Sequence, residues 1–189
     1  QYGGKCLLRF EDANPEKVAQ EYVDAMLEDI EGYLGITPDG IRYVSDDLEV
    51  MYEYAKKLIM HGKVYVCSCE RKGMQELRHS GKECPCSKAD VKTTMSLWEK
   101  MMKGVYKEGE AVLRLKGEMQ AQNQVMRDPV LFRVVEAKHF RKGTKYKVWP
   151  MYDFYNPIED HLMGVTHILR TNEFDQRVEL QDLLKDLLG

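Results

Sequence analysis

The sequence of 189 residues contains no apolar run near the roughly 20 residues that a membrane-spanning helix needs. It has no signal-peptide pattern at its start, no internal repeat and no low-complexity stretch. These absences exclude a membrane protein, a collagen and a coiled coil. The first residue is Gln1, and Leu7 and Leu8 already have the character of a strand. We therefore expect the chain to be a segment of a longer protein.

Sequence signatures of several common enzyme classes are also missing. There is no Gly-rich phosphate loop, no H-E-x-x-H and no G-x-S-x-G. The five histidines show no metal-ligand spacing, so each is expected to be an exposed or hydrogen-bonded imidazole. Apolar residues make up 43% of the chain and charged residues 31%, which predicts a packed core and argues against disorder. The length suits one medium domain or two small ones.

The net charge of -3 conceals a strong segregation of charge along the chain. Residues 1–50 carry 12 acidic and 4 basic side chains, whereas residues 56–148 carry 21 basic and 10 acidic ones. Residues 149–189 are acidic again, with 8 acidic and 3 basic side chains. A solvated surface can drift in this way by chance. The size of the excess favours a middle segment that faces a polyanion, with nucleic acid as the first candidate.

Four of the five cysteines form two C-x-C pairs that are separated by 14 residues. Four thiolates from two such turns match a closed, tetrahedral, structural zinc site. Four reduced thiols or a redox pair are the alternatives. An odd cysteine count without a secretory signal indicates a reducing compartment, and Cys6 is expected to be a buried thiol in a strand. The predicted zinc ligands are Cys67, Cys69, Cys84 and Cys86.

Hydrophobic periodicity predicts an α/β protein. A helix is expected to begin at Asn14–Pro15, with Asn14 as its cap, and to end at Gly35. A second begins near Ser45–Asp47 and ends at Gly62, and its apolar face is expected to consist of Leu48, Met51, Tyr52, Ala55, Leu58 and Ile59. The other predicted helices are 73–79, 91–103, 153–163 and 177–188. The predicted strands are 5–10, 64–67, 111–115, 130–135 and a buried one at 165–169.

The apolar α/β pattern of the sequence is interrupted after Gly62 and returns at Val148, which predicts a division into three stretches. Residues 1–62 are interpreted as the first part of an α/β domain, residues 63–147 as a basic insertion, and residues 148–189 as the second part of the domain. The paired cysteines lie inside the insertion.

Several motifs, in order along the chain, resemble one enzyme family. Leu8–Pro15 (L-R-F-E-D-A-N-P) resembles the strand-turn-helix of class I glutamyl- and glutaminyl-tRNA synthetases, except that Ala13 replaces the usual threonine. Trp149–Phe154 and Gly164–Thr171 are similar to the second conserved block of that family. Between these blocks, Gly109–Arg114 and Val125–Leu131 are similar to the archaeal-type glutamyl enzymes.

The resemblance implies a Rossmann-like class I synthetase catalytic domain, in part, interrupted by an α+β insertion that binds the tRNA acceptor end. It implies ATP-dependent ligation of glutamate to tRNA through glutamyl-adenylate. The expected partners are ATP with Mg²⁺, glutamate and the glutamate tRNA, with the glutamine tRNA as a second candidate. Zn²⁺ is expected as a structural ion, and the location is expected to be cytoplasmic with no membrane contact. The family's His-Ile-Gly-His and Lys-Met-Ser-Lys-Ser motifs are not among these residues, so the 189 residues alone are expected to be inactive.

The same resemblance implies a binding site for glutamate. Glu11 would face the substrate ammonium group, and Tyr152 and Asn156 would orient the amino acid with neutral groups. Arg170 would bind the side-chain carboxylate of glutamate through paired N–H donors. Enzymes that load glutamate have arginine at this position, whereas the glutaminyl enzymes, which resemble them, have cysteine. No side chain is expected to act as an acid–base catalyst. The expected contacts to the ATP ribose are Thr171, Asn172 and Glu173.

Other interpretations remain open from the sequence. Glu11 could cap the following turn, Tyr152 could belong to the core, and Arg170 could form a structural salt bridge with Glu173 or Asp175. Within the family, a glutaminyl enzyme or a paralogue with another acceptor is the alternative; Arg170 argues against the first and the nearly complete insertion against the second. A non-catalytic, zinc-stabilised RNA-binding module is the alternative from another class.

Overall fold

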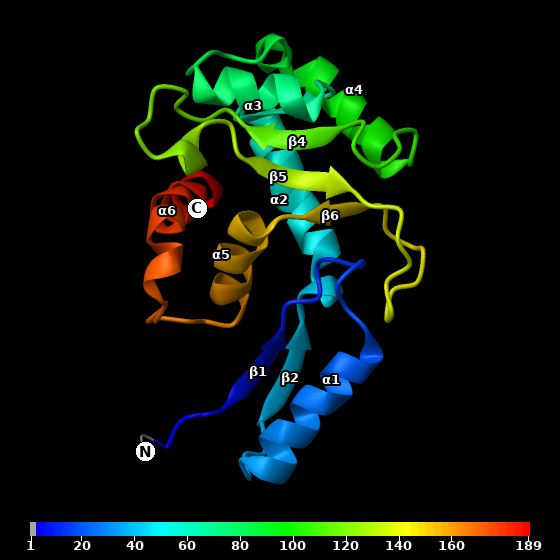
Figure 1. Cartoon of the computed structure of the whole chain (residues 1–189), viewed down its shortest axis with the longest axis vertical. Helices are drawn as coiled ribbons and strands as arrows, with labels where there is room; N and C mark the ends of the chain where they lie inside the picture. The colour runs from blue at the N-terminus through cyan, green and yellow to red at the C-terminus, as the bar shows by residue number, and fades with distance from the viewer. Residues whose placement is uncertain (1–2) are drawn as a thin grey trace.

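The computed structural model of the chain describes residues 3–189, and the strands of this part form two sheets (Figure 1). The first is a parallel pair, β1–β2, and the second is antiparallel with the strand order β3-β4-β5-β6. The strands are β1 Leu7–Phe10, β2 Gly40–Tyr43, β3 Val64–Cys67, β4 Val112–Leu115, β5 Val130–Val134 and β6 Val148–Pro150.

The helices surround the antiparallel sheet and flank the parallel pair (Figure 1). The longer ones are α1 Gln20–Leu27, α2 Leu48–Met60, α3 Arg71–His79, α4 Val91–Met102, α5 Tyr152–Leu162 and α6 Asp175–Leu188. Short turns of helix are η1 Glu28–Tyr33, η2 Val44–Asp46, η3 Pro85–Lys88, η4 Gln124–Met126 and η5 Asn172–Phe174. Within the described residues, no helix has both the length and the apolar character to cross a membrane.

The parallel pair places the end of β1 next to α5. Leu7 pairs with Gly40 and Phe10 with Tyr43, and the last two rings stack at a centroid distance of 5.2 Å. The connection between the two strands runs through α1, as a parallel connection requires a long crossover. Functional side chains of α/β sheets commonly follow the carboxyl ends of parallel strands. Glu11 directly follows β1 and therefore lies at such an end.

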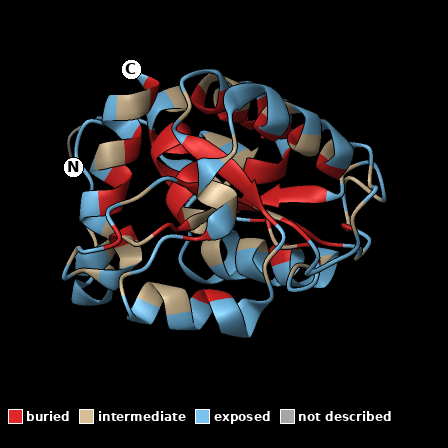
Figure 2. Cartoon of the chain, turned by 90° about the horizontal axis from the view of Figure 1, so that it is seen from above, coloured by how far each residue is buried: buried red, intermediate tan, exposed pale blue. Residues whose placement is uncertain are grey.

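The hydrophobic core forms where α2 packs against the antiparallel sheet (Figure 2). The predicted apolar face of α2 is confirmed, since all of its six residues are buried. Tyr52 of this face packs against Trp98 and Phe132, and its hydroxyl donates a hydrogen bond of 2.6 Å to the carbonyl of Val148. The face consists of Leu48, Met51, Tyr52, Ala55, Leu58 and Ile59.

His139 connects the loop after β5 to the turn that follows β1. Its ring is fully buried and stacks on Trp149 at 5.0 Å. Nδ1 accepts hydrogen bonds from the backbone N–H groups of Arg141 and Lys142, both at 3.1 Å. Nε2 therefore carries the proton and donates it to the carbonyl of Asp12 at 2.9 Å. One neutral imidazole thus holds together segments that are 127 residues apart.

The predicted start of the first helix is wrong. Asn14 and Pro15 begin a turn instead, in which the Lys17 N–H donates to the Asn14 carbonyl at 3.0 Å. This agrees with the preference of β-turns for asparagine in the first position and proline in the second. Ala19 is extended, and α1 begins only at Gln20. The strand β2, of four residues, was not predicted from the sequence.

The predicted buried strand at 165–169 is also wrong. These residues form no strand, and Leu169 is 97% exposed. Gly164 has a φ of 68° and ends α5, after which the segment has no strand beside it among residues 3–189. A strand needs such a partner for its backbone hydrogen bonds. Cys6 precedes β1 and is exposed, so its expected burial is wrong as well.

The division at 62/63 and 147/148 stays a prediction. The described structure shows that β6, which follows the second boundary, pairs with β5, which precedes it. The main core likewise combines residues from all three stretches, such as Leu58, Leu113 and Leu180.

Tyr52→Phe should lower the free energy of unfolding by about 1 kcal/mol, because the buried carbonyl of Val148 loses its donor while packing is kept. Urea denaturation measures this. Tyr54→Phe on the same helix is the control, since the Tyr54 side chain is only half-buried and takes no part in this contact. Equal stability of the Tyr52 variant and the unmodified protein would contradict the prediction.

Candidate active site and metal centre

Arg9 of β1 lies at the centre of a polar group between β1 and α5. Its Nη1 donates to Oδ1 of Asp160 at 2.8 Å, and its Nη2 donates to Oδ1 of Asn156 at 2.6 Å. Nη2 also contacts Oε1 of Glu11 at 3.2 Å. Asn156 and Asp160 are four residues apart on α5 and therefore share one face of the helix. They also bond to each other at 3.3 Å.

Arg170 joins this group from the segment after α5. Its Nη2 lies 3.7 Å from Oδ2 of Asp160, and its Nη1 donates to Oε1 of Gln181 in α6. The Nε2 of Gln181 donates to Oδ1 of Asp153 at 3.4 Å. The other oxygen of Asp153 accepts a hydrogen bond from Arg177. The partner of Arg170 is thus Asp160 rather than one of the acidic residues that follow it in sequence.

Aromatic side chains form one wall of the polar group. The rings of Tyr152 and Tyr155 meet edge to face at 5.6 Å, and Phe174 lies 5.5 Å from Tyr152. The hydroxyl of Tyr155 donates to Oε2 of Glu11 at 3.4 Å. Burial, and after it the charge of Glu11, raises the pKa of both tyrosines. Both hydroxyls therefore stay protonated at neutral pH and can donate hydrogen bonds.

The charges of the group balance. Two guanidinium groups, Arg9 and Arg170, face two carboxylates, Glu11 and Asp160. Burial opposes the charge of Arg9, but its hydrogen bond and Coulombic attraction to Asp160 outweigh this, so its pKa is raised. The Glu11 side chain is 39% exposed, against 11–16% for Asp160, Arg170 and Arg9. The arrangement therefore offers an accessible carboxylate and a largely desolvated guanidinium to a small zwitterion.

The structure brings all four residues of the predicted glutamate site into this one group. Glu11, Asn156 and Arg170 are joined through Arg9 and Asp160, and Tyr152 packs on Tyr155. The three residues expected at the ATP ribose are exposed and follow Arg170 directly. Their turn reaches the group through the contact of Phe174 with Tyr152. These residues are Thr171, Asn172 and Glu173.

Sequence reasoning missed four members of the group. Arg9 stands two residues before Glu11, on the same face of an extended chain, and Asp160 stands one helical turn after Asn156. These spacings were visible signals. Tyr155 and Gln181 gave none, because their roles depend on how α5 and α6 pack.

Glu159 directly precedes Asp160 in α5 and is fully buried. Both of its carboxylate oxygens lack a hydrogen-bond partner among the described residues. Burial raises its pKa from the ordinary 4.5 to about 7, and the charge of Asp47 adds to this effect. Arg9 and Arg42 oppose the shift without cancelling it. An unpaired buried carboxylate is costly, so the folded protein holds the proton.

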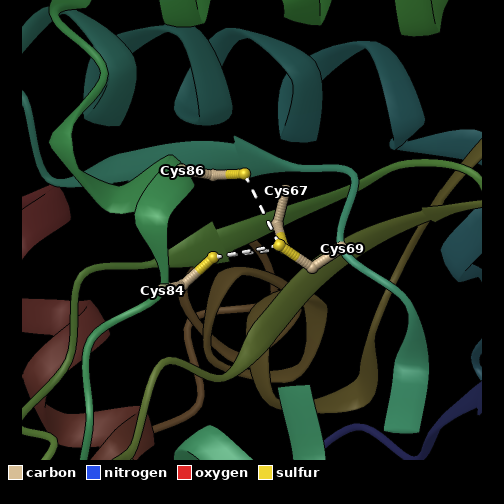
Figure 3. A group of neighbouring side chains, drawn as sticks. All are labelled: Cys67, Cys69, Cys84 and Cys86. Carbon is tan, nitrogen blue, oxygen red and sulfur yellow. Dashed lines mark hydrogen bonds between the residues drawn. The ribbon is translucent and has the colours of Figure 1, made fainter. Parts of the chain in front are cut away.

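The four paired cysteines meet in one place, at the end of β3 and around η3 (Figure 3). Sγ of Cys69 lies 3.5 Å from Sγ of Cys84 and 3.7 Å from that of Cys86, and Cys67 lies 3.7 Å from Cys84. All four sulfur atoms are within 4.8 Å of one another. Tetrahedral zinc with Zn–S bonds of about 2.3 Å requires S–S distances of about 3.8 Å. The donor set and spacing therefore fit a zinc ion.

The cysteines belong to a second, separate cluster of buried residues with Tyr65 and Met74. Without an ion, burial raises the pKa of the Cys84 and Cys69 thiols. The backbone N–H of Ser68 and the neighbouring thiols lower the pKa of Cys86 and outweigh its burial. A cation at the centre of the four sulfur atoms would favour thiolates throughout.

Residues 1–189 match the family described as tRNA synthetases class I (E and Q), catalytic domain. The chain therefore belongs to this family of class I synthetases, which confirms the predicted fold class: an α/β synthetase catalytic domain with a parallel and an antiparallel sheet.

Relatives and solved structures agree with this assignment. The chain is 47% identical over 188 residues to a glutamate–tRNA ligase of Nitrosopumilus maritimus (strain SCM1), and 43% identical over 191 residues to one of Pyrococcus abyssi (strain GE5 / Orsay). Both matches cover 100% of the chain but 33% of the relative, so the chain spans about a third of these proteins. The fold also matches the crystal structure of a glutamate tRNA ligase from Elizabethkingia meningosepticum in complex with its amino acid. That match has a TM-score of 0.68 at 19% identity and covers 99% of this chain and 41% of the other.

Glu159→Gln should flatten the dependence of stability on pH. Above pH 4.5 the unfolded chain ionises Glu159 while the folded protein keeps the proton, so the native protein loses stability up to pH 7. The loss is about 1.4 kcal/mol per pH unit. The variant lacks this loss, so its stability relative to the native protein should rise by about 2 kcal/mol from pH 5 to pH 7.

Urea denaturation at both pH values measures the difference, with the exposed Glu21→Gln as the control. The same pH dependence in the Glu159 variant and the native protein would show that this carboxyl group is not held protonated.

Proposed function

We propose that this chain forms part of the active site of an enzyme that ligates glutamate to tRNA at the expense of ATP. The observation that carries the proposal is the joining of Glu11 and Arg170 in one polar group through Arg9 and Asp160. The whole-chain match to the class I family and the names of the relatives support it.

Glutamate would bind with its ammonium group at Glu11, where the carboxylate is accessible. Tyr152 and Asn156 would orient the amino acid without adding charge. Arg170 would bind the side-chain carboxylate through two parallel N–H donors. Asp160 already pairs with Arg170, so glutamine would not leave the guanidinium without a counter-ion, but it would lose the charge-assisted parallel hydrogen bonds of a carboxylate, at a cost of about 1.5–3 kcal/mol. This is enough to discriminate between the two amino acids.

In the first step, the α-carboxylate oxygen of glutamate attacks the α-phosphorus of ATP, and the bond to pyrophosphate breaks. In the second, a hydroxyl of the terminal adenosine of tRNA attacks the carbonyl carbon, and AMP leaves. The residues of this chain position the reactants and balance their charge rather than move protons. ATP would bring Mg²⁺ with it. Thr171, Asn172 and Glu173 are assigned to the ATP ribose.

The basic stretch would bind the acceptor end of tRNA as an insertion between the two parts of the catalytic domain, in a cytoplasmic enzyme. Many of its cations are exposed and available to phosphates. They include Lys63, Arg71, Lys72, Lys82, Lys88, Lys92, Lys100, Lys107, Lys116 and Lys138.

A zinc ion held by the four cysteines would be structural, because a site closed by four thiolates leaves no position for substrate. It would fix the segment between β3 and α4, where the small second cluster is otherwise the only core. Cys67 and Cys69 would supply one pair of ligands and Cys84 and Cys86 the other.

Two other functions are less well supported. In a glutaminyl enzyme, Arg170 would face a neutral amide rather than a carboxylate. A non-catalytic RNA-binding module does not require two arginines and two carboxylates together with aromatic side chains at the end of β1. Such a module would bind tRNA in a salt-sensitive manner and would not respond to an aminoacyl-adenylate.

Arg170→Ala should weaken binding of a non-hydrolysable glutamyl-adenylate analogue by about 100-fold, because a desolvated ion pair is lost. Isothermal titration of the protein expressed from its complete reading frame measures this beside the glutaminyl analogue. Lys185→Ala, an exposed change on α6, is the control. Binding of tRNA but of neither analogue would overturn the proposal in favour of the RNA-binding module.

Cys84→Ser should remove bound zinc and lower the melting temperature by about 10 °C, since structural zinc contributes folding free energy directly. Metal analysis and thermal unfolding measure the two effects. Cys6→Ser is the matched control, because Cys6 is exposed and distant in sequence from the cluster. An unmodified protein purified without any metal, and unaffected by added zinc, would contradict the assignment.

A further inference from the structure

Gln181 is a buried amide on the apolar side of α6. Only 1% of its surface is exposed, and its neighbours on the same face, Leu180 and Leu184, are completely buried. Burying an amide costs free energy unless both its ends are hydrogen-bonded. Gln181 meets this condition through two side chains from outside its own helix, Arg170 and Asp153.

The two partners fix which way the amide points. An ionised Asp153 can only accept, so the N–H₂ end of Gln181 must face it, at 3.4 Å. An arginine can only donate, so the carbonyl end must face Arg170. Arg177 holds the other oxygen of Asp153. The hydrogen bonds that run from Arg177 through Asp153 and Gln181 to Arg170 therefore allow only one orientation of the Gln181 amide.

Arg170 depends on such contacts because its backbone is not in a strand or a helix. Its neighbour Leu169 is 97% exposed. The Arg170 side chain is nevertheless only 15% exposed, with Gln181 on Nη1 and Asp160 on Nη2. Two helices, α5 and α6, thus hold a side chain that its own segment does not fix.

The neutrality of Gln181 matters as much as its contact. The charges of Arg9 and Arg170 are already balanced by Glu11 and Asp160. A carboxylate at position 181 would hold Arg170 equally well, but it would add a negative charge beside the place where a substrate carboxylate must bind. An amide holds the guanidinium without adding to the negative charge that a substrate carboxylate must meet.

We propose that Gln181 is a positioning residue for Arg170, and that its neutral amide sets the preference for glutamate over glutamine. The inference rests on the proposed function, in which Arg170 binds the side-chain carboxylate of the substrate. Gln181 itself touches no reacting atom.

The test measures the affinities of glutamyl- and glutaminyl-adenylate analogues for the protein expressed from its complete reading frame, at pH 8 so that a new carboxyl group is ionised. Gln181→Glu should lower the ratio of glutamyl to glutaminyl affinity by about tenfold or more, because the added charge repels only the substrate that carries a carboxylate. Gln176→Glu is the matched control, with the same change on an exposed position of the same helix. It should keep the ratio of the native protein.

Gln181→Met provides a second variant of similar size that adds no charge. It should lower the ratio several-fold, because Arg170 loses its acceptor while the packing of α6 is retained. A purely structural role would lower the melting temperature and weaken both analogues equally, leaving the ratio unchanged; that result would overturn the inference.

The outcomes separate the two proposals. If the native protein prefers the glutamyl analogue and Arg170→Ala abolishes the preference, the proposed function holds. An unchanged ratio in both Gln181 variants would then refute only the role of Gln181. If the native protein shows no preference, the proposed function fails and the inference fails with it.

Discussion

The hydrogen bonds of Arg9 are the constraint on which the candidate site depends. One planar guanidinium reaches Glu11, directly after its own strand, and both Asn156 and Asp160 on α5, which are 147 and 151 residues later in the chain. Its planar fork directs five N–H donors to fixed positions, whereas a lysine would offer a compact ammonium with three. Without this cation, the carboxylates of Glu11 and Asp160 would repel each other at the junction of β1 and α5.

Neutral polar groups position the charged ones around this junction. Tyr155 donates to Glu11, Asn156 bridges Arg9 and Asp160, and Gln181 bridges Arg170 and Asp153. Each fixes the direction of a charged side chain without changing the net charge of the site. The proposed glutamate site would benefit from this, because every additional fixed charge would compete with a charged ligand. His139, as a neutral imidazole, performs the same kind of task between the loop after β5 and the turn after Glu11.

The antiparallel sheet has a different basis for its stability. Its main face packs on α2 and contributes to the large core. The segment between β3 and α4, all of it within the described residues, packs instead on the small cluster of Tyr65, Cys67, Met74 and Cys84. A cluster of this size buries little apolar surface. A zinc ion held by the four cysteine sulfur atoms, as proposed above, would supply the stability that the apolar contacts lack.

Local pattern in the sequence determined the apolar face of α2 and the cysteine pairs, and the resemblance to a family singled out Glu11, Tyr152, Asn156 and Arg170 as the proposed glutamate site. These depend on spacing and residue type, which a sequence contains directly. Tertiary structure alone decided that residues 165–169 are not a strand and that Gln181 faces Arg170. A strand needs a neighbour and a buried amide needs partners, and both come from parts of the chain far away in sequence. Periodicity cannot report such contacts, because they arise only when the elements pack.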